Sequence, residues 1–355
     1  MPCPGASHDG HGTPDPRPAP CLSVIMPAHN ARAFIGTAIG SLFGQTRRDF
    51  EVIVIDDGST DGTADVVTAL ASARHETSPE VRLLRQSRTG AGGARNAGIA
   101  AARSELIGFL DADDRWEPRM VVRQVERFAA DAAIDLCCTG FRHVDERGEP
   151  VAGAVFRPPP VIDVSSLLRM NTIHTSTVVM RRETCRRVGG FDAELPTHED
   201  HDLWLRVAAL RPGNIASIPD CLCDYRLWRG QSSADWRRMH EGWMRVIAKR
   251  TAEVPAAWAS SVGVAAANHL DYCASLAYAA GDVRSMRRLV LRSWMARGWR
   301  LLARPHAGLF MTLVAALTCL PDPVGRRAVG SLQHARTAWR QARFHGPAPS
   351  RRVIR

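Results

Sequence analysis

Carboxylates gather in three short segments of this sequence, and each segment suits a different piece of chemistry. The segments are residues 56–62 (DDGSTDG), residues 111–114 (DADD) and residues 198–202 (HEDHD). A carboxylate can accept hydrogen bonds from a nucleobase or a ribose, ligate a hard cation such as Mg²⁺ or Mn²⁺, or serve as a general base. These three segments are therefore the first candidates for a functional site.

The segment at residues 56–62 has two interpretations. A tight turn that opens a helix favours Asp, Ser and Gly, and such a turn accounts for Thr60, Asp61 and Gly62. It does not account for the consecutive carboxylates of Asp56 and Asp57, which directly follow an apolar run. Hydrogen bonding of Asp57 to a nucleotide would account for them, and both interpretations stay open at this point.

Asp111, Asp113 and Asp114 place three carboxylates within four positions. Such groups repel one another unless a cation lies among them, and Mg²⁺ or Mn²⁺ commonly binds one or two carboxylates together with substrate phosphates. The alternative is a solvated acidic loop that caps a helix beginning near Glu117 and Pro118. Because the segment directly follows a buried apolar run, we favour the metal site.

Two further segments combine charge with helix signals. Acids in the first turn of a helix, as at Glu199 and Asp200, are favoured by the helix dipole, and they are also candidates for a general base. Residues 90–98 (GAGGARNAG) match a dinucleotide fingerprint weakly, because Arg95 occupies the place of the third glycine. The guanidinium of Arg95 is suited either to a phosphate or to the acidic segments.

Alternating strands and helices must position these groups. Apolar runs of the buried-strand type lie at residues 22–26, 51–55, 81–84 and 106–110, with helical patterns between them at residues 34–43, 61–73 and 91–102. This alternation predicts an α/β fold with a mostly parallel central sheet and flanking helices. Ligands of such sheets bind beyond the carboxyl ends of the strands, which is where Asp57 and Asp111 stand.

Charge is distributed unevenly along the chain. Residues 1–225 carry 24 Lys and Arg against 30 Asp and Glu, a net −6, whereas residues 226–355 carry 22 against 6, a net +16. The second part has helical patterns and is rich in Arg, so we expect a basic α-helical region that faces an anionic membrane surface. It contains no recognised DNA-binding motif, and we expect no nucleic acid partner.

Residues 307–320 are an apolar stretch without a charge in the basic region. As a helix these fourteen residues would measure about 21 Å, less than the roughly 30 Å hydrocarbon core of a bilayer. We favour an interfacial helix with an Arg-rich flank, and packing against the α/β part of the chain is the alternative. Arg326 and Arg327 follow and suit anionic lipid.

Cysteine usage and the N-terminus bear on location. The nine cysteines are scattered without the spacing of a zinc site, so we expect reduced thiols in a reducing compartment. Residues 1–20 are rich in proline and contain no apolar segment of the secretory type. We therefore expect a disordered leader, and a cytoplasmic protein at the inner face of the plasma membrane.

Taken together, the segments resemble the family 2 inverting glycosyltransferases, which have the type A glycosyltransferase fold, a Rossmann-like architecture. The matching stretches, in the order of the family, are SVIMPAHN, VIVIDDGSTDGT, GAGGARNAGI, FLDADD, RRVGGFD and HEDHDLWLRVA. The resemblance runs from Ser23 to about Ser233, roughly 60% of the chain. It implies transfer of a sugar from a nucleoside-diphosphate sugar to a hydroxyl group, with a divalent metal.

The resemblance also implies a donor site. Asp57 would bind the base, Asp113 would touch the Mg²⁺ or Mn²⁺ ion, and Asp111 would touch the ribose or the sugar. The family usually has Tyr at the position of His29. This sequence therefore departs from the pattern at the residue that would stack on the base. The nucleotide-sugar-binding residues would be Pro27, His29, Asn30, Asp57, Arg95, Asn96, Asp111 and Asp113.

On the acceptor side, the resemblance makes Asp200 the catalytic base, with Glu199 and Trp204 shaping the acceptor pocket. Residues 189–192 (GGFD) resemble a loop that closes the sugar pocket, and residues 225–232 a segment that often closes over the diphosphate. The acceptor would be a carbohydrate or a lipid-linked glycan, as in cell-surface polysaccharide synthesis.

Two other functions deserve comparison with this one. A sugar-1-phosphate nucleotidyltransferase would carry a glycine-rich loop with a basic residue after the first strand, where this chain has PAHN at residues 27–30. A non-catalytic nucleotide-sugar-binding protein or membrane scaffold would not need Asp200. The predicted division is a leader at residues 1–20, a catalytic domain at 21–233, an Arg-rich helical region at 234–343 and a basic tail at 344–355.

Overall fold

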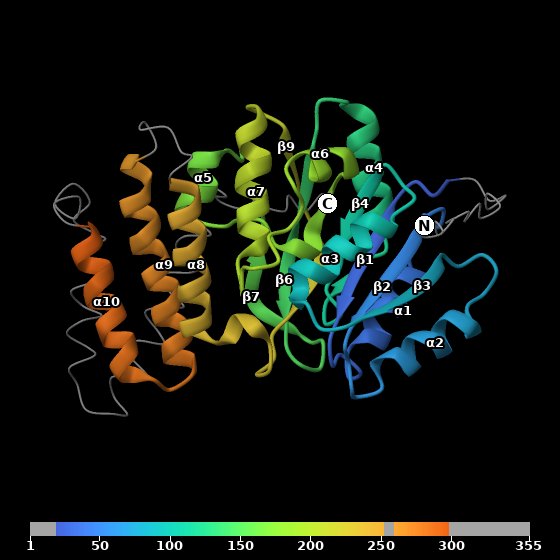
Figure 1. Ribbon diagram of the computed structural model, residues 1–355, viewed down its shortest axis with the longest axis horizontal. Coiled ribbons are helices and arrows are strands. Elements are labelled where there is room, and N and C mark those ends of the chain that lie inside the picture. Colours follow the sequence, from blue (N-terminus) through green and yellow to red (C-terminus); the bar gives the residue numbers. More distant parts are fainter. Residues whose placement is uncertain (1–18, 252–258, 298–355) are drawn as a thin grey trace, which may run out of the picture.

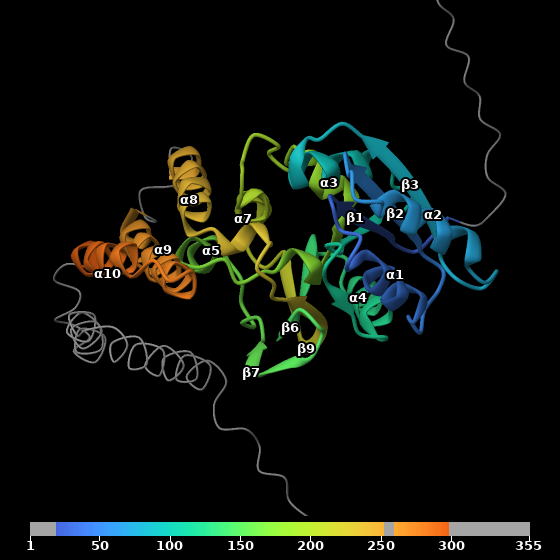
Figure 2. The same cartoon turned by 90° about the horizontal axis from the view of Figure 1, so that it is seen from below.

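A nine-stranded mixed sheet lies at the centre of the computed structural model, which describes residues 19–251 and 259–297. The strand order is β3-β2-β1-β4-β8-β6-β9-β5, and β7 pairs with β6 beside this path. Helices cover both faces of the sheet, and three more helices stand at one end of the molecule (Figures 1 and 2).

The first half of the sheet is built of parallel strands joined by helices, as predicted. Strand β1 pairs with β2 and β4, and β2 pairs with β3, all in parallel. Helix α2 begins two residues later than expected because the carboxylate of Asp61 accepts a hydrogen bond from the backbone of Thr63 and stays outside the helix. The elements are β1 (Ser23–Ala28), α1 (Ile35–Phe43), β2 (Glu51–Asp57), α2 (Thr63–Ala73), β3 (Glu80–Gln86), α3 (Gly90–Ala101) and β4 (Leu106–Phe109).

Alternation along these strands divides the core between the two faces of the sheet. Ile25, Ile53 and Ile55 point to the face covered by α3, while Val24 and Val52 point to the face covered by α1. All five side chains are fully buried. Because both faces are covered, the polar ends of the strands are the part of this half that is left for ligands.

The second half of the sheet is less regular. Strand β8 runs antiparallel to both of its neighbours, β4 and β6, whereas β6 and β9 are parallel. Six strands therefore point the same way and β5, β7 and β8 oppose them, which confirms a mostly parallel sheet. The elements are β5 (Arg115–Trp116), α4 (Met120–Ala130), β6 (Leu136–Val144), β7 (Pro150–Phe156), α5 (Val164–Arg169), β8 (Val178–Arg181), α6 (Arg182–Arg187), α7 (Glu199–Leu210) and β9 (Ile215–Arg226).

Three helices follow the sheet, α8 (Trp236–Thr251), α9 (Ala259–Ala279) and α10 (Val283–Arg297). They lie side by side at the end of the molecule opposite α2 (Figure 1). A small apolar core that includes Leu270, Cys273, Met286 and Leu289 joins α9 to α10. This arrangement confirms a helical region after the sheet.

Several predictions concern segments outside the described residues, namely most of the leader, residues 307–320 with Arg326 and Arg327, and the tail at 344–355. Within the part of the chain that is described, no helix combines the length and the apolar character needed to cross a membrane. The seven described cysteines are free, and five of them are buried, as expected for reduced core thiols.

Candidate active site

The turn after β2 is held together by Asp57. One oxygen of its carboxylate accepts hydrogen bonds from the backbone N–H of Thr89 at 2.8 Å and from the Gln86 side chain at 2.9 Å, and the other accepts from the N–H of Gly90 at 2.8 Å. Burial alone would raise the pKa of Asp57, but these hydrogen bonds outweigh it and lower the pKa. Asp57 is thus an anionic anchor for the start of α3.

Pro27, His29 and Asn30 lie beside this turn, as expected. Pro27 stands near the end of β1, and the Nδ1–H of His29 donates to the Asp57 carbonyl oxygen at 2.8 Å. The side-chain oxygen of Asn30 accepts from the N–H of Thr60 at 2.9 Å. These contacts fix the β1 and β2 turns against each other at the edge where a nucleotide would bind.

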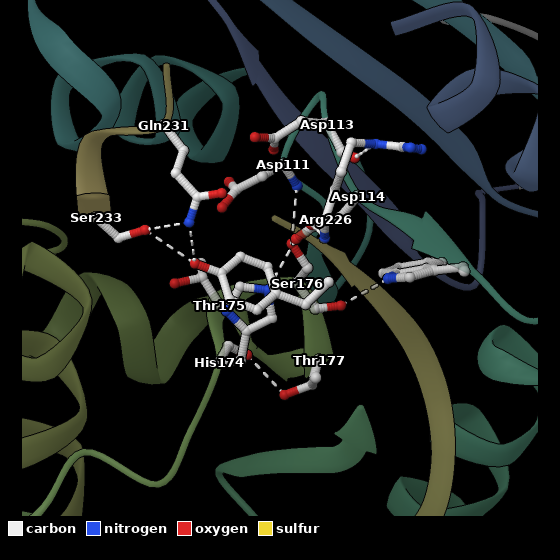
Figure 3. A network of polar contacts seen from close by, with 12 residues as sticks. Asp111, Asp113, Asp114, His174, Thr175, Ser176, Thr177, Arg226, Gln231 and Ser233 are labelled. Atoms are coloured by element: carbon white, nitrogen blue, oxygen red, sulfur yellow. Dashed lines mark hydrogen bonds and ion pairs between the residues drawn. The ribbon is translucent and has the colours of Figure 1, made fainter. Parts of the chain in front are cut away.

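In the turn after β4, Asp114 has a supporting position. Its carboxylate accepts hydrogen bonds from Ser176 Oγ at 2.5 Å, from His174 Nε2 at 2.8 Å and from the backbone N–H of Arg226 at 3.0 Å (Figure 3). Ser176 Oγ also accepts from the N–H of Asp111 at 3.0 Å. The buried Asp114 therefore holds the turn in place and leaves Asp111 and Asp113 to face the site.

Asp113 has few compensating partners. The indole N–H of Trp228 donates to one of its carboxylate oxygens at 2.8 Å. Burial, together with the negative charges of Asp114 and Asp111, raises the pKa of Asp113 to about 7. Among the described residues Asp113 thus has no ion-pair partner, at the position where the resemblance expects a metal ion.

Trp228 depends on the glycine two residues further along the chain. A Cβ atom at Gly230 would lie 2.0 Å from Cζ3 of Trp228, so a side chain there would displace the indole. Beside it, the guanidinium of Arg226 donates to the carbonyl oxygen of Asp113 at 2.8 Å. Residues 225–233 thereby cover the acidic turn, and Gln231 and Ser233 complete the network (Figure 3).

Arg95 connects the two acidic groups that lie far apart in the sequence. Its guanidinium donates to Asp111 at 2.7 Å and to Glu199 at 2.6 Å. Burial opposes the charged form, but the two carboxylates outweigh it and raise the pKa of Arg95. The position of Arg95 in a glycine-rich helix start is explained by this bridge between the turn after β4 and the start of α7.

Asn96 supports the loop at residues 189–192. Its amide donates to the carbonyl oxygen of Phe191 at 2.8 Å, and its side-chain oxygen accepts from the N–H of Phe191 at 2.9 Å. Gly190 has a φ of +69°, and a Cβ there would lie 2.8 Å from Asn96 Oδ1. In this structure Asn96 positions the GGFD loop.

Asp200 lies at the start of α7 and is partly exposed. One carboxylate oxygen accepts from Thr175 Oγ1 at 3.1 Å and from the Asn171 amide at 3.4 Å. Residues 171–177 (NTIHTST) therefore contact both Asp200 and Asp114, and the sequence interpretation overlooked them. Their signal is a run of polar residues directly before the apolar strand β8.

Trp204 corrects an expectation. It is fully buried, with its ring 6.1 Å from the Phe191 ring and 6.4 Å from the Phe109 ring between centroids. A helix that carries its acids at one end must bury its apolar side in the core, and Trp204 is on that side. Trp204 therefore supports the site from behind and offers no surface to an acceptor, while Glu199 pairs with Arg95.

The oxygen donors of Asp111 and Asp113 fit a divalent metal of the Mg²⁺ or Mn²⁺ type, because such ions prefer carboxylates and phosphates. Asp114, His174 and Cys223 also place possible ligand atoms within 4.8 Å of one another. The Asp114 carboxylate in that group is already used by three protein donors. Asp113 is therefore the residue that would hold the ion, and Asp111, which pairs with Arg95, lies beside it in the same turn.

This combination of sheet and site defines a class of protein. A mostly parallel sheet with acidic turns after β2 and β4, faced by the acidic start of α7, is the type A glycosyltransferase fold. Residues 23–188 match the model of glycosyl transferase family 2. Over these residues the chain is similar to this family.

Relatives known by sequence agree. An uncharacterized glycosyltransferase of Nostoc sp. is 42% identical over 107 residues, and the match covers 30% of this chain and 32% of that protein. The chain thus spans about a third of the length of this relative. TuaG of Bacillus subtilis, named as a putative teichuronic acid biosynthesis glycosyltransferase, is 29% identical over 63% of this chain and 86% of its own.

Solved structures show the same fold. Staphylococcus aureus TarS 1–349, solved in complex with UDP-GlcNAc, has a TM-score of 0.56 at 19% identity over 90% of this chain and 92% of that one. The mannosyltransferase PcManGT of Pyrobaculum calidifontis, in complex with GDP-Man and Mn²⁺, has a TM-score of 0.57 at 20% identity over 92% and 88%.

Proposed function

We propose that this chain is an inverting glycosyltransferase that moves a sugar from a nucleoside-diphosphate sugar to a hydroxyl group of a carbohydrate or lipid-linked acceptor. The proposal depends above all on Arg95, which ties the acidic turn after β4 to the start of α7. This bridge holds the acidic turn, which suits a metal ion bound to a diphosphate, next to the start of α7, where Asp200 suits a general base. The relatives TuaG and WfaP, the latter a glucosyltransferase acting on a lipid diphosphate, support cell-surface glycan synthesis as the context.

The donor half would work as follows. His29 and Asn30 border the base, and Asp57, besides anchoring α3, faces the same edge of the sheet. A divalent ion held by Asp113, with Asp111 beside it toward the ribose or the sugar, would supply charge neutralisation for the departing nucleoside diphosphate, and the Mn²⁺ complex of PcManGT supports such an ion. Arg226, which covers the acidic turn from the other side, adds a second positive group.

The acceptor half centres on Asp200. A general base must reach the hydroxyl proton it removes, and Asp200 is partly exposed at the start of α7. Thr175 and Asn171 donate to one of its oxygens and hold the carboxylate in one orientation. With Asp200 taking the proton, the acceptor oxygen attacks the anomeric carbon from the face opposite the leaving diphosphate, and the configuration inverts.

The first test is release of nucleoside diphosphate from UDP-, GDP- and dTDP-sugars with Mn²⁺, using the Asp200→Asn variant. General-base catalysis typically contributes about 10²–10⁴-fold in rate, so we expect a loss of that size with donor affinity kept. Asp65→Asn, on the exposed face of α2, is the matched control and should keep full activity. Near wild-type turnover of Asp200→Asn would show that Asp200 is not the general base. Tight donor binding by a wild-type protein that never turns over, with acceptors supplied, would support the binding-only alternative.

We further propose that α10 docks on an anionic membrane, which would place the protein at the inner face of the plasma membrane. Leu291, Trp294 and Met295 are 46–60% exposed and share one face by their spacing of three and four. Arg287, Arg288 and Arg292 are exposed on the same helix. Large apolar side chains beside several Arg are the pattern of an interfacial helix.

Co-sedimentation with liposomes tests this surface. We expect binding to vesicles that contain anionic phospholipid, weakened by salt, and at least about 10-fold weaker binding for the pair Arg287→Glu and Arg288→Glu, since each basic residue near such a surface contributes about 1 kcal/mol. Arg48→Glu, exposed near β2, is the control. Equal recovery in the supernatant with and without anionic vesicles would argue against the surface.

We also propose that the chain is divided into a catalytic domain at residues 21–233 and a helical region at residues 234–343.

A further inference from the structure

Two imidazoles and a thiol meet where α8 and α9 pack together, away from the acidic turns. His240 comes from α8, and His269 and Cys273 come from α9. One possible ligand atom from each residue lies within 4.8 Å of the other two. This group takes no part in the function proposed above.

Helix geometry explains why these side chains converge. His269 and Cys273 are four residues apart, so they lie on the same face of α9. The Nε2 atom of His269 is 3.2 Å from the sulfur of Cys273. On α8, Trp243 stacks on the His269 ring with centroids 4.5 Å apart, and the His240 ring lies nearly parallel to it at 5.4 Å. The three groups are therefore held in place by packing.

Burial makes the group unusual. Cys273 is fully buried and His269 is 7% exposed. The Nδ1 atom of His240 is also buried, and no described residue forms a hydrogen bond with it. A buried polar atom without a partner costs free energy, and a bound cation would provide that partner.

The chemistry of the group selects the cation. Two imidazole nitrogens and one thiolate are the ligands of Zn²⁺, which binds nitrogen at about 2.0–2.1 Å and sulfur at about 2.3 Å. The three ligand atoms lie within 4.8 Å of one another, and the 3.2 Å between His269 Nε2 and the Cys273 sulfur is close to the separation of about 3.5 Å that these bond lengths give for two ligands of one tetrahedral ion. Mg²⁺ and Mn²⁺ prefer oxygen ligands and suit Asp113 instead. We propose that His240, His269 and Cys273 form a zinc site.

The position of the group indicates what a bound Zn²⁺ would do. The His198 ring lies 5.7 Å from the His269 ring between centroids, and His198 directly precedes Glu199 and Asp200 at the start of α7. Zinc at this place would join α8 to α9 directly behind the helix that carries the proposed base. The site would therefore be structural, with the catalytic ion elsewhere.

The test measures metal on the full-length wild-type chain and on Cys273→Ser. After dialysis against metal-free buffer without chelator, we expect one zinc per wild-type chain by elemental analysis, and none for the variant. Loss of a direct ligand should weaken Zn²⁺ affinity at least about 100-fold, more than the 10–100-fold typical of losing an outer-shell partner. Co²⁺ added to the stripped protein should give a thiolate charge-transfer band that Cys273→Ser lacks.

Three controls keep the result specific. Cys185→Ser changes a buried cysteine of α6 and should keep the zinc and the band. His240→Gln changes a partly exposed ligand, so it tests the site even if Cys273→Ser folds poorly. Asp113→Asn should lose transferase turnover while keeping the zinc, which separates this proposal from the proposed function. A folded wild-type chain without zinc that gives no cobalt band would overturn the site.

Discussion

The turns after β2 and β4 present the same residue type at equivalent places, and their carboxylates behave in opposite ways. Asp57 accepts hydrogen bonds from the start of α3, which lower its pKa. Asp113 has the Trp228 indole as a donor and two carboxylates as neighbours, and its pKa is raised to about 7. The first turn satisfies the charge of Asp57 internally, whereas Asp113 in the second turn has no ion-pair partner among the described residues, because Arg95 pairs with Asp111.

This difference teaches how one sheet edge can serve two purposes. Backbone N–H groups at a helix start stabilise an anion, so the turn after β2 is complete without a ligand. In the turn after β4, Asp114 accepts three hydrogen bonds and Asp111 pairs with Arg95, while Asp113 accepts from the Trp228 indole and is the proposed metal ligand. Stability should therefore depend on Asp57, and turnover on Asp113.

Replacing Asp113 should give the largest effect on activity. Asp113→Asn removes the proposed metal ligand, and a metal's stabilisation of transition-state charge is worth several kcal/mol. We expect donor turnover to fall by about 10³-fold or more, with little change in the free energy of unfolding. Nucleoside-diphosphate release with Mn²⁺, compared with EDTA-treated wild-type protein, measures the first quantity, and thermal unfolding measures the second. A strong loss of stability in Asp113→Asn would contradict the division in which turnover depends on Asp113 and stability on Asp57.

Replacing Asp57 should give a smaller effect, and one on stability. Hydrogen bonds to a charged group contribute about 1.5–3 kcal/mol, and an amide at this position cannot satisfy the donors of Thr89, Gly90 and Gln86 in the same way. We expect Asp57→Asn to lose about 1.5–3 kcal/mol in the free energy of unfolding. Denaturant unfolding checks this, and an unchanged midpoint with unchanged slope would contradict it.

The smallest effect concerns pH. The pKa of Asp57 is lower in the folded protein than its ordinary value near 4, so its ionised form stabilises the fold above that pH. This contribution is lost as the pH falls through the pKa that Asp57 has in the folded protein. The stability difference between wild type and Asp57→Asn should therefore be constant near neutral pH and shrink below about pH 4. Denaturant unfolding at a series of pH values measures this difference, and growth of the difference on acidification would reverse the assigned sign.

The sequence predicted the first half of the fold well because its signals are local. Apolar runs, helical spacing and turn residues placed β1 to β4 and α1 to α3 within a few residues of their ends. The second half was largely overlooked, since short strands such as β5 and β8 have few residues in which a pattern can develop. Their pairing depends on partners far along the chain.

For the site, residue types were predictable and their partners were not. The motifs indicated Asp111, Arg95 and Glu199 separately, and the bridge among them spans 104 residues of sequence between Arg95 and Glu199. Trp204 was assigned to an acceptor pocket because helix position alone does not reveal which side faces the core. His240 lies 29 residues before His269, and this spacing does not resemble a metal motif.

The insertion of β8 between β4 and β6 has a consequence for biosynthesis. Strands β3, β2, β1 and β4 are complete in the nascent chain long before residues 178–181 are made. At about 5–20 residues per second, the free edge of β4 waits several seconds for the strand that covers it. An unpaired edge is a template for association with other chains, so crowded ribosomes or slowed translation between β4 and β8 should favour aggregation of newly made protein.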